Sequence, residues 1–236
     1  MHGGPFVRHQ MTTDSVRRIW RLGDAMVVDQ QRDRHGQHVA DPVLFCFGTA
    51  DGLTPLLAEV SRTLSSRPAR LSIEAHAEPA LPRRWRHAQA TRWDAMWTDR
   101  RPDPVPGEDE VAVVTDDGEI NALLDRANPD THGRPGDPGM RAWVGVREGA
   151  ELVAVGALST VVVTGIAHLR GVSTLPGLRG RGLGTAVSAR LTRMGLDTVS
   201  PLVTLGVYTA NAAAISVYRR LGYHHDRSFV SGPVRQ

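Results

Sequence analysis

The sequence contains no lysine, and all 28 of its positively charged residues are arginines. This absence excludes a P-loop lysine, a lysine Schiff base and a serine–lysine catalytic pair. Cysteine is almost absent as well, because Cys46 is the single one in the chain. One thiol excludes an internal disulfide framework and a cysteine-based zinc site, and its apolar neighbours predict a buried, unreactive side chain. No G-x-S-x-G motif occurs, which excludes the nucleophile elbow of a serine hydrolase.

Long apolar runs are missing too. The first twelve residues contain no apolar stretch of the kind found in a signal peptide. The most apolar window, Leu152–Leu169, is interrupted by glycine, serine, threonine and histidine and is rich in β-branched residues. A transmembrane helix needs about 20 mostly apolar residues, so this window predicts two buried strands instead. We therefore expect a soluble, cytoplasmic protein.

What the chain does contain is a globular balance of residues. Apolar residues make up 41% and charged residues 22% of the 236 positions, which is unlike a disordered chain and sufficient for one large or two small domains. The formal net charge is +3. This mildly basic balance fits an acidic ligand, but it is too weak to indicate nucleic acid by itself.

The sharpest change in composition is the segment Arg101–Gly107, which reads RPDPVPG. Alternating prolines favour an extended connector, so we predict a domain boundary there, with domains at 1–105 and 106–236. The first domain reads as a small α/β module with strands at 25–28, 43–47 and 71–75 and a helix at 53–64. The spacing of Trp85, Trp93 and Trp97 predicts one helical face, packed in a core or a domain interface. Stacking of nucleic acid bases on these rings is the weaker alternative.

The second domain alternates between strand and helix patterns. A Gly- and Pro-rich stretch at 128–139 predicts a loop, and 142–158 predicts a hairpin. The complete order is β-α-β-β-β-α-β-α-β, which indicates a mixed α/β sheet flanked by helices. The predicted strands lie at 111–114, 142–146, 152–158, up to 174, 203–208 and 223–230, and the helices lie at 119–127, after the glycines of 180–184, and at 211–220.

The most informative segment is 172–186, VSTLPGLRGRGLGTA. A strand ends there, and Gly180, Gly182 and Gly184 open a helix with an apolar stripe at 183, 187, 191 and 194. The first amides of a helix have no internal partner, the helix dipole is positive at that end, and glycine lets a ligand approach closely. The segment therefore predicts an anion cradle that suits a pyrophosphate, and Arg179 and Arg181 add positive charge.

Other interpretations of these glycines are weaker. A Walker loop needs a lysine, and a dinucleotide fingerprint needs G-x-G-x-x-G, whereas the glycines here run G-x-G-x-G. An RGG-type nucleic-acid segment is repeated, and this one occurs once. A helix start that uses glycine only to turn the chain is the remaining structural alternative.

The pattern Arg179-x-x-Gly182-x-Gly184 resembles the best-known motif of the GNAT superfamily of N-acetyltransferases. A second feature follows in register: Asn211 after the next strand, Tyr218 seven residues later, and then Gly222-Tyr223. The resemblance spans roughly residues 108–236. It implies a GNAT-like mixed sheet, preceded here by a smaller, incomplete GNAT-like module, as in bacterial two-module members.

The resemblance also implies acetyl-CoA as the acyl donor. It implies that the pyrophosphate is held by Gly180, Arg181, Gly182, Leu183, Gly184 and Thr185, beside Arg179. It implies that the backbone of Val172, Ser173 and Thr174 pairs with the pantetheine arm, which Asn211 also contacts, and that the acyl end enters where this strand splays from 203–208. A metal is not implied.

Tyr218 is the candidate general acid for the leaving thiolate, because an ordinary tyrosine stays protonated at neutral pH. On helix pattern alone, Tyr218 would belong to a packed apolar stripe, and Asn211 would cap its helix. The usual family base is an acidic residue five positions before the Asn, and here that position is Gly206. His168, a carboxylate of a substrate loop, or a chain of waters are the substitutes.

We therefore expect an acetyl-CoA-dependent N-acetyltransferase that moves an acetyl group to a primary amine of a small molecule or an amino terminus. The alternative is a non-catalytic module that binds or senses acyl-CoA, which Gly206 favours. We expect no nucleic-acid or membrane partner, and we weigh a homodimer through sheet edges or the Trp-rich module. The consecutive His224, His225 and Asp226 are expected on a solvated strand, because neighbouring strand residues point to opposite faces and zinc prefers spaced ligands.

Overall fold

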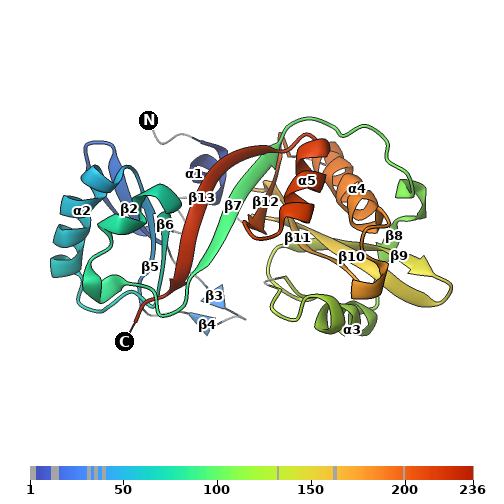
Figure 1. Ribbon diagram of the computed structural model, residues 1–236, viewed down its shortest axis with the longest axis horizontal. Helices are drawn as coiled ribbons and strands as arrows, with labels where there is room; N and C mark the ends of the chain where they lie inside the picture. The colour runs from blue at the N-terminus through green and yellow to red at the C-terminus, as the bar shows by residue number, and fades with distance from the viewer. Residues whose placement is uncertain are drawn as a thin grey trace. The chain divides into compact units, whose positions relative to one another are not determined.

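The structure is a computed structural model. It describes residues 4–11, 16–30, 33–34, 37–38, 41–131, 133–161, 164–198 and 200–235. Contacts divide the chain into two compact units. Unit 1 comprises Met1–Ala95, Val207–Ala210 and Asp226–Gln236, and unit 2 comprises Met96–Gly206 and Asn211–His225. The boundary at residue 105 stays a prediction. In the structure, three strands have residues in both units: β7 (Thr91–Thr98), β12 (Val203–Tyr208) and β13 (His224–Pro233), all labelled in Figure 1.

Unit 1 contains a mixed sheet with the strand order β1-β2-β5-β6-β13. Strands β5 and β6 are parallel, and the other neighbours are antiparallel. Helix α2 begins after Thr49, whose side-chain oxygen accepts a hydrogen bond from the Gly52 N–H at 3.2 Å. The elements are α1 (Pro5–Gln10), β1 (Val16–Leu22), β2 (Ala25–Gln30), β3 (Asp33–Arg34), β4 (Gln37–His38), β5 (Val43–Phe47), α2 (Ala50–Thr63), β6 (Arg70–Glu74), η2 (Ala75–Ala80), η3 (Arg83–Trp85), β7 (Thr91–Thr98) and β13 (His224–Pro233).

The two faces of this sheet carry different cores, because side chains alternate along a strand. Leu44 and Cys46 of β5 pack with the apolar face of α2. Phe45 and Phe47 of the same strand pack with Phe6 of α1. Cys46 is fully buried, which confirms the predicted burial, and this burial raises the pKa of its thiol.

The prediction that Trp85, Trp93 and Trp97 share one helical face is wrong. Trp85 ends the short helix η3, and the other two lie on strand β7. A spacing of four residues fits the period of a strand as well as that of a helix, so the pattern did not discriminate. The packing prediction holds for Trp85, which is 2% exposed in the core of unit 1. Trp93 stacks on Phe229 with ring centroids 4.7 Å apart.

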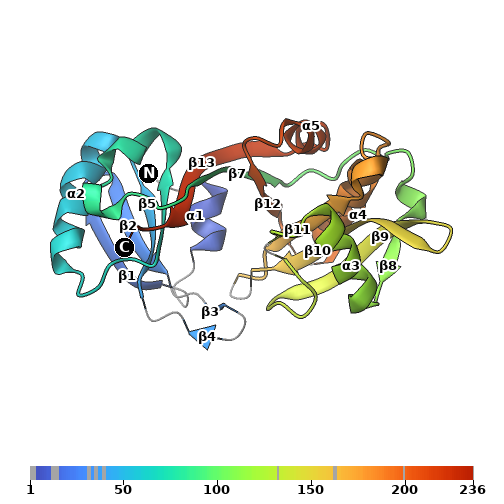
Figure 2. The same cartoon turned by 60° about the horizontal axis from the view of Figure 1, so that its bottom comes forward.

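Unit 2 contains a sheet with the order β12-β11-β10-β9-β8. All neighbours are antiparallel except β11 and β12, which are parallel. Helix α4 lies on one face of this sheet and α3 on the other (Figures 1 and 2). The predicted order of strands and helices is confirmed, as is the mixed α/β class. The elements are η4 (Glu108–Glu110), β8 (Ala112–Val114), α3 (Asp117–Ala127), β9 (Met140–Glu148), β10 (Glu151–Thr160), β11 (Ala167–Thr174), η5 (Pro176–Leu178), α4 (Leu183–Thr198), β12 (Val203–Tyr208) and α5 (Ala212–Arg220).

The window 152–169, which predicted two buried strands, forms most of β10 and the start of β11. The side chains of β10 are mainly buried, whereas those of β11 alternate between buried and partly buried. In the part of the chain that the structure describes, no helix has the length and apolar character needed to cross a bilayer.

Candidate active site

Strand β11 changes face in its middle because it contains a β-bulge. Ser173 pairs with Val155 and Arg170 pairs with Ala157, so two residues of β11 stand opposite Gly156 alone. Gly171 has a φ of +60°, a left-handed conformation that glycine adopts without strain. An isolated glycine inside a strand pattern is the sequence signal for such a bulge, and the sequence-based predictions did not include it.

Side chains alternate between the two faces of the sheet along β11, and the extra residue of the bulge shifts this alternation for the residues that follow it. A Cβ at Gly156 would lie 2.8 Å from Val187 of α4 and 3.1 Å from Val172, so Val172 faces α4. Thr174, two residues further on, also faces α4, since its hydroxyl would lie 3.6 Å from a Cβ at Gly184. Ser173 therefore points to the opposite face.

Strands β11 and β12 are joined by a short ladder. Within the described residues, its pairs are Ala167↔Val203, His168↔Thr204 and Leu169↔Leu205. Strand β11 continues to Thr174 beyond the last pair. The backbone of 172–174, predicted to pair with a pantetheine arm, thus lies in the part of β11 that this ladder does not occupy.

The loop after β11 presents an uninterrupted series of backbone N–H groups. Gly182 caps α4, because its carbonyl oxygen accepts hydrogen bonds from Thr185 at 2.9 Å and Ala186 at 3.0 Å. Among the described residues, no hydrogen-bond acceptor lies against the N–H groups of residues 180–184. Gly180 and Gly182 have φ angles of +80° and +86°, and a Cβ on either would meet nothing within 4 Å. The predicted cradle is therefore open, and it combines unpaired donors with the positive end of a 16-residue helix.

The two arginines of this loop are bonded to the protein. Arg179 donates from Nε to the Thr174 carbonyl oxygen at 3.3 Å and from Nη2 to that of Ala127 at 3.1 Å. These bonds tie the loop to the ends of β11 and α3. Arg181 forms an exposed ion pair with Glu148 at 2.8 Å. Both arginines therefore orient or flank the cradle, and their contact with a ligand stays a prediction.

Asn211 and Tyr218 occupy the first and last turns of α5. The Asn211 side-chain oxygen accepts a hydrogen bond from Ala214 N–H at 3.1 Å, so Asn211 does cap its helix. Tyr218 is 8% exposed, and its ring lies 5.7 Å from that of Tyr223. The Tyr223 hydroxyl in turn bonds Thr192 of α4 at 2.9 Å.

Burial raises the pKa of Tyr218 to about 12, because the phenolate would lose its hydration. The Ser188 hydroxyl opposes this rise less strongly, and Ser188 Oγ makes no hydrogen bond of normal geometry in the described part of the chain. Tyr218 therefore keeps its proton across the neutral range. It packs in a core, as the helix pattern predicted, and it retains the protonation state that a general acid requires.

His168 lies on β11 and is the base candidate of that strand. Its Nδ1 lies 2.8 Å from Thr204 Oγ1, and that hydroxyl donates to the Ala167 carbonyl oxygen at 3.1 Å. Since the hydroxyl proton is used there, we assign the imidazole proton to Nδ1. Burial, and secondly the charge of Arg170, lower the pKa of His168 to about 3. His168 is therefore neutral at pH 7 but a weak base. Neither β11 nor β12 carries a carboxylate, because Gly206 occupies the position at which the family usually has an acidic residue.

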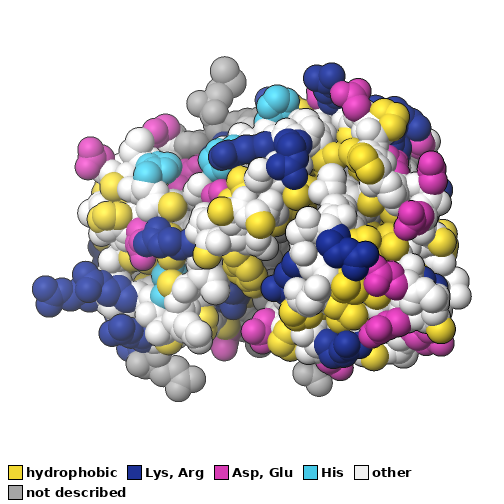
Figure 3. All heavy atoms as spheres, turned by 45° about the vertical axis from the view of Figure 1, so that its right-hand side comes forward, with side chains coloured by type: hydrophobic (Ala, Val, Ile, Leu, Met, Phe, Trp, Pro, Cys, Tyr) yellow, Lys and Arg dark blue, Asp and Glu magenta, His cyan; other side chains and the backbone are white. Residues whose placement is uncertain are grey.

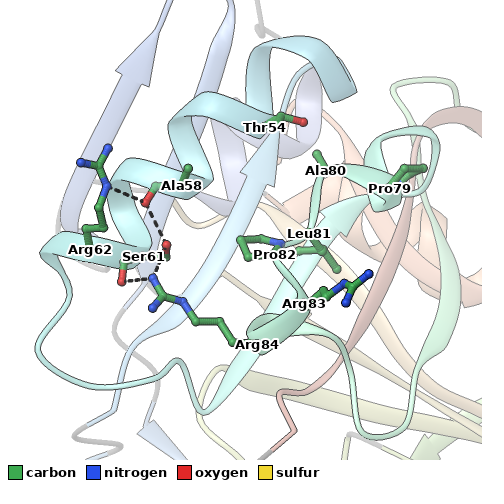
Figure 4. A pocket seen from close by; sticks show the side chains of 10 residues that line it. All are labelled: Thr54, Ala58, Ser61, Arg62, Pro79, Ala80, Leu81, Pro82, Arg83 and Arg84. Atoms are coloured by element: carbon green, nitrogen blue, oxygen red, sulfur yellow. Dashed lines mark hydrogen bonds between the residues drawn. The ribbon is translucent and has the colours of Figure 1, made fainter.

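Other features lie apart from this site. A surface hollow in unit 1 lies between α2 and the segment 79–84 (Figure 4), and its Arg84 side chain is bonded to the Ser61 carbonyl oxygen at 2.5 Å. His224, His225 and Asp226 begin strand β13, as predicted. The residues that the structure describes include no group of three metal-ligating side chains arranged around a common point.

Solved structures of acetyltransferases share this fold. A GNAT-family structure from Novosphingobium aromaticivorans DSM 12444 is 19% identical, covers 96% of this chain and 94% of its own, and superposes with a TM-score of 0.57. A GCN5-related N-acetyltransferase from Kribbella flavida is 18% identical, with 99% and 100% covered and a TM-score of 0.58. Another from Sphaerobacter thermophilus is 16% identical, with 88% and 75% covered and a TM-score of 0.56. At these identities the likeness concerns the fold.

The sequence itself gives the family. The model of the acetyltransferase (GNAT) family matches residues 93–223, more than half of the chain, and this range contains the cradle, Asn211 and Tyr218. The chain therefore belongs to the GNAT acetyltransferase family, which confirms the resemblance. Comparison with curated proteins gives no match.

Proposed function

We propose that the protein is an N-acetyltransferase that uses acetyl-CoA to acetylate a primary amine of a small molecule or an amino terminus. The observation that carries this proposal is the row of five N–H groups, residues 180–184, at the start of α4, for which the described residues supply no acceptor. Two glycines in this row, Gly180 and Gly182, hold left-handed conformations and face open space. Membership of the acetyltransferase family supports a diphosphate of CoA as the anion for which this backbone is shaped.

The remaining contacts follow the chain away from this cradle. The pantetheine arm would run along the backbone of 172–174, beyond the ladder between β11 and β12. Asn211, at the start of α5, would contact the same arm. The acyl group would then lie near the bulge, where β11 no longer pairs with β12.

The chemistry is a direct transfer. The lone pair of the amine attacks the thioester carbonyl carbon, a C–N bond forms, and the C–S bond breaks with its electrons on sulfur. A backbone N–H near Thr174 stabilises the oxyanion, and the Tyr218 hydroxyl gives its proton to the thiolate. The proton lost by the amine passes to water, because His168 is a weak base and Gly206 offers no carboxylate. The products are an amide and free CoA, and Tyr218 regains its proton from solvent.

The alternative is a module that binds acyl-CoA without turnover, and Gly206 is the observation that favours it. Calorimetry with CoA, followed by a thiol-release assay with acetyl-CoA and a panel of amines, separates the two. CoA binding together with release that depends on one class of amine is the expected result. Binding without release on any amine would establish the sensor, and no binding at all would refute both.

On the face shown in Figure 3, arginine side chains are interspersed with aspartates and glutamates and do not form a continuous basic stripe. Among the described residues, exposed ion pairs also join Arg126 to Glu151 at 2.8 Å and Arg147 to Glu119.

A further inference from the structure

The face of β11 that points away from α4 collects donor groups that have no hydrogen-bond acceptor among the described residues. Arg170 precedes the bulge, Ser173 follows it, and Trp143 reaches the bulge from strand β9. A Cβ at Gly171 would lie 3.0 Å from the Trp143 ring, so this indole covers the bulge. The glycine is required here, because any side chain would meet the indole.

Contacts of the loop 128–139 show that Arg170 lies on this same side. A Cβ at Gly133 would lie 2.9 Å from Cβ and 3.5 Å from Cδ of Arg170, and the Gly133 carbonyl oxygen would lie 3.5 Å from a Cβ at Gly171. Gly133 thus adjoins both the Arg170 stem and the face covered by Trp143. Ser173 points to this face as well, since its neighbours Val172 and Thr174 face α4.

Each of these three side chains lacks a partner in the described part of the chain. Trp143 and Ser173 are each 6% exposed, and neither Nε1 of Trp143 nor Oγ of Ser173 has a hydrogen-bond partner. The Arg170 guanidinium forms no hydrogen bond or ion pair there, although it is partly buried and feels the more distant charge of Asp137. Buried polar groups are nearly always bonded, and an unmade bond costs about 1–3 kcal/mol, so the two buried groups, Trp143 Nε1 and Ser173 Oγ, require an explanation.

The chemistry of the three groups defines what would satisfy them. Arginine and the indole N–H are donors without acceptor capacity, and the serine hydroxyl can also donate. A planar anion suits this set, because a guanidinium binds a carboxylate through two parallel hydrogen bonds. A single arginine with neutral donors matches one negative charge. In the proposed function, the phosphates of the acyl donor bind the backbone N–H groups of residues 180–184, so they do not need this face.

We propose that Arg170, Trp143 and Ser173 form a carboxylate subsite for the acceptor, so that the acetylated amine belongs to an amino acid or to a short peptide with a free carboxylate. This inference rests on the proposed function, because it places the acceptor on the sheet face opposite α4. Tyr218 and the cradle approach the thioester from the α4 side, so the amine reaches the carbonyl from the other side. The subsite orients the acceptor, and it takes no part in bond making.

The test uses products and their amides as paired probes. The purified chain, with and without CoA, is titrated with N-acetylglycine, N-acetylleucine and N-acetylglutamate and with the primary amides of their α-carboxyl groups, by calorimetry. At least one acid should bind tenfold or more tightly than its amide. Arg170→Gln should reduce that preference to within twofold, and Arg170→Lys should retain part of it, since lysine keeps the charge but not the paired geometry. Arg190→Gln, which removes an exposed arginine of α4, is the matched control and should change nothing.

The outcomes separate the subsite from the proposed function. Equal binding of acids and amides, a preference that survives in Arg170→Gln, or no binding of any probe while CoA binds normally would each overturn the carboxylate subsite and leave the acetyltransferase proposal standing. Failure of CoA to bind would overturn the acetyltransferase, and the titrations without CoA would still decide the subsite. Trp143→Phe supplies a second variant that keeps an aromatic side chain but removes the indole N–H, and it should weaken acid binding several-fold without affecting the amide.

Discussion

Replacement of Gly182 by alanine tests the cradle most directly. Gly182 has a φ of +86°, and a Cβ there would touch nothing within 4 Å. The alanine methyl group would therefore not clash with the protein. The left-handed conformation alone should lower the free energy of unfolding, by about 1–2 kcal/mol. The ligand, in contrast, meets a methyl group where the diphosphate must approach the backbone.

The loss of CoA affinity can be estimated from the hydrogen bonds that the diphosphate would lose. If the methyl group displaces the diphosphate from a single N–H, the loss is about 1.5 kcal/mol, the lower value for a hydrogen bond to a charged group, and this is roughly a tenfold increase in Kd. Displacement from two of the five amides would raise the factor to about 100. Calorimetric titration with CoA measures this directly, and chemical denaturation measures the stability.

Gly107→Ala is the matched control for this variant. Gly107 has a φ of +76° and also faces open space, but it precedes the short helix η4 and lies outside the cradle sequence. Both variants should lose a similar free energy of unfolding, and only Gly182→Ala should lose CoA affinity. Unchanged CoA binding by Gly182→Ala, or an equal loss in Gly107→Ala, would refute the assignment of these amides to the diphosphate.

Three further predictions follow from the packing of unit 2. Tyr218→Phe should lower turnover about 100-fold while CoA affinity stays within twofold, because the ring still fills its buried site and only the proton donor is lost; steady-state kinetics with calorimetry would show it, and unchanged turnover would remove Tyr218 from the mechanism. Glu108→Ala should lower the free energy of unfolding, measured by urea denaturation, by about 3 kcal/mol, because it leaves the largely buried charge of Arg193 without its 2.6 Å partner. The double variant Glu108→Leu/Arg193→Met should recover part of this loss, and an additive loss would contradict the coupling. Burial lowers the pKa of His168 to about 3, below its ordinary value near 6.5, so between these values the unfolded chain binds a proton at His168 that the folded chain does not. The free energy of unfolding should therefore be highest above pH 6.5 and fall by up to about 2 kcal/mol by pH 5. His168→Gln should flatten this dependence on pH.

Much of unit 2 could be predicted because its signals are local. The stripe Leu183, Val187 and Leu191 gave helix α4, and β12 has the bounds that its β-branched run predicted. The cradle was equally local, since its glycines and its helix start are consecutive in the chain. In unit 1, the same kind of pattern gave α2 but failed for Trp93 and Trp97, because a spacing of four residues fits a helix and a strand alike.

By itself, the sequence determined which backbone segment could hold a diphosphate and which tyrosine stands in register with it. Those properties depend on neighbours along the chain: glycine conformation, free amides at a helix start, and a cap seven residues before a phenol. Only the tertiary structure decided that Arg179 is bonded to the ends of α3 and β11. It alone also showed that Trp143 and Ser173 bring buried donors, which have no partner in the described part of the chain, to the side of Arg170. Each of those results joins residues far apart in sequence, and a one-residue bulge reverses the face on which every later side chain of β11 lies.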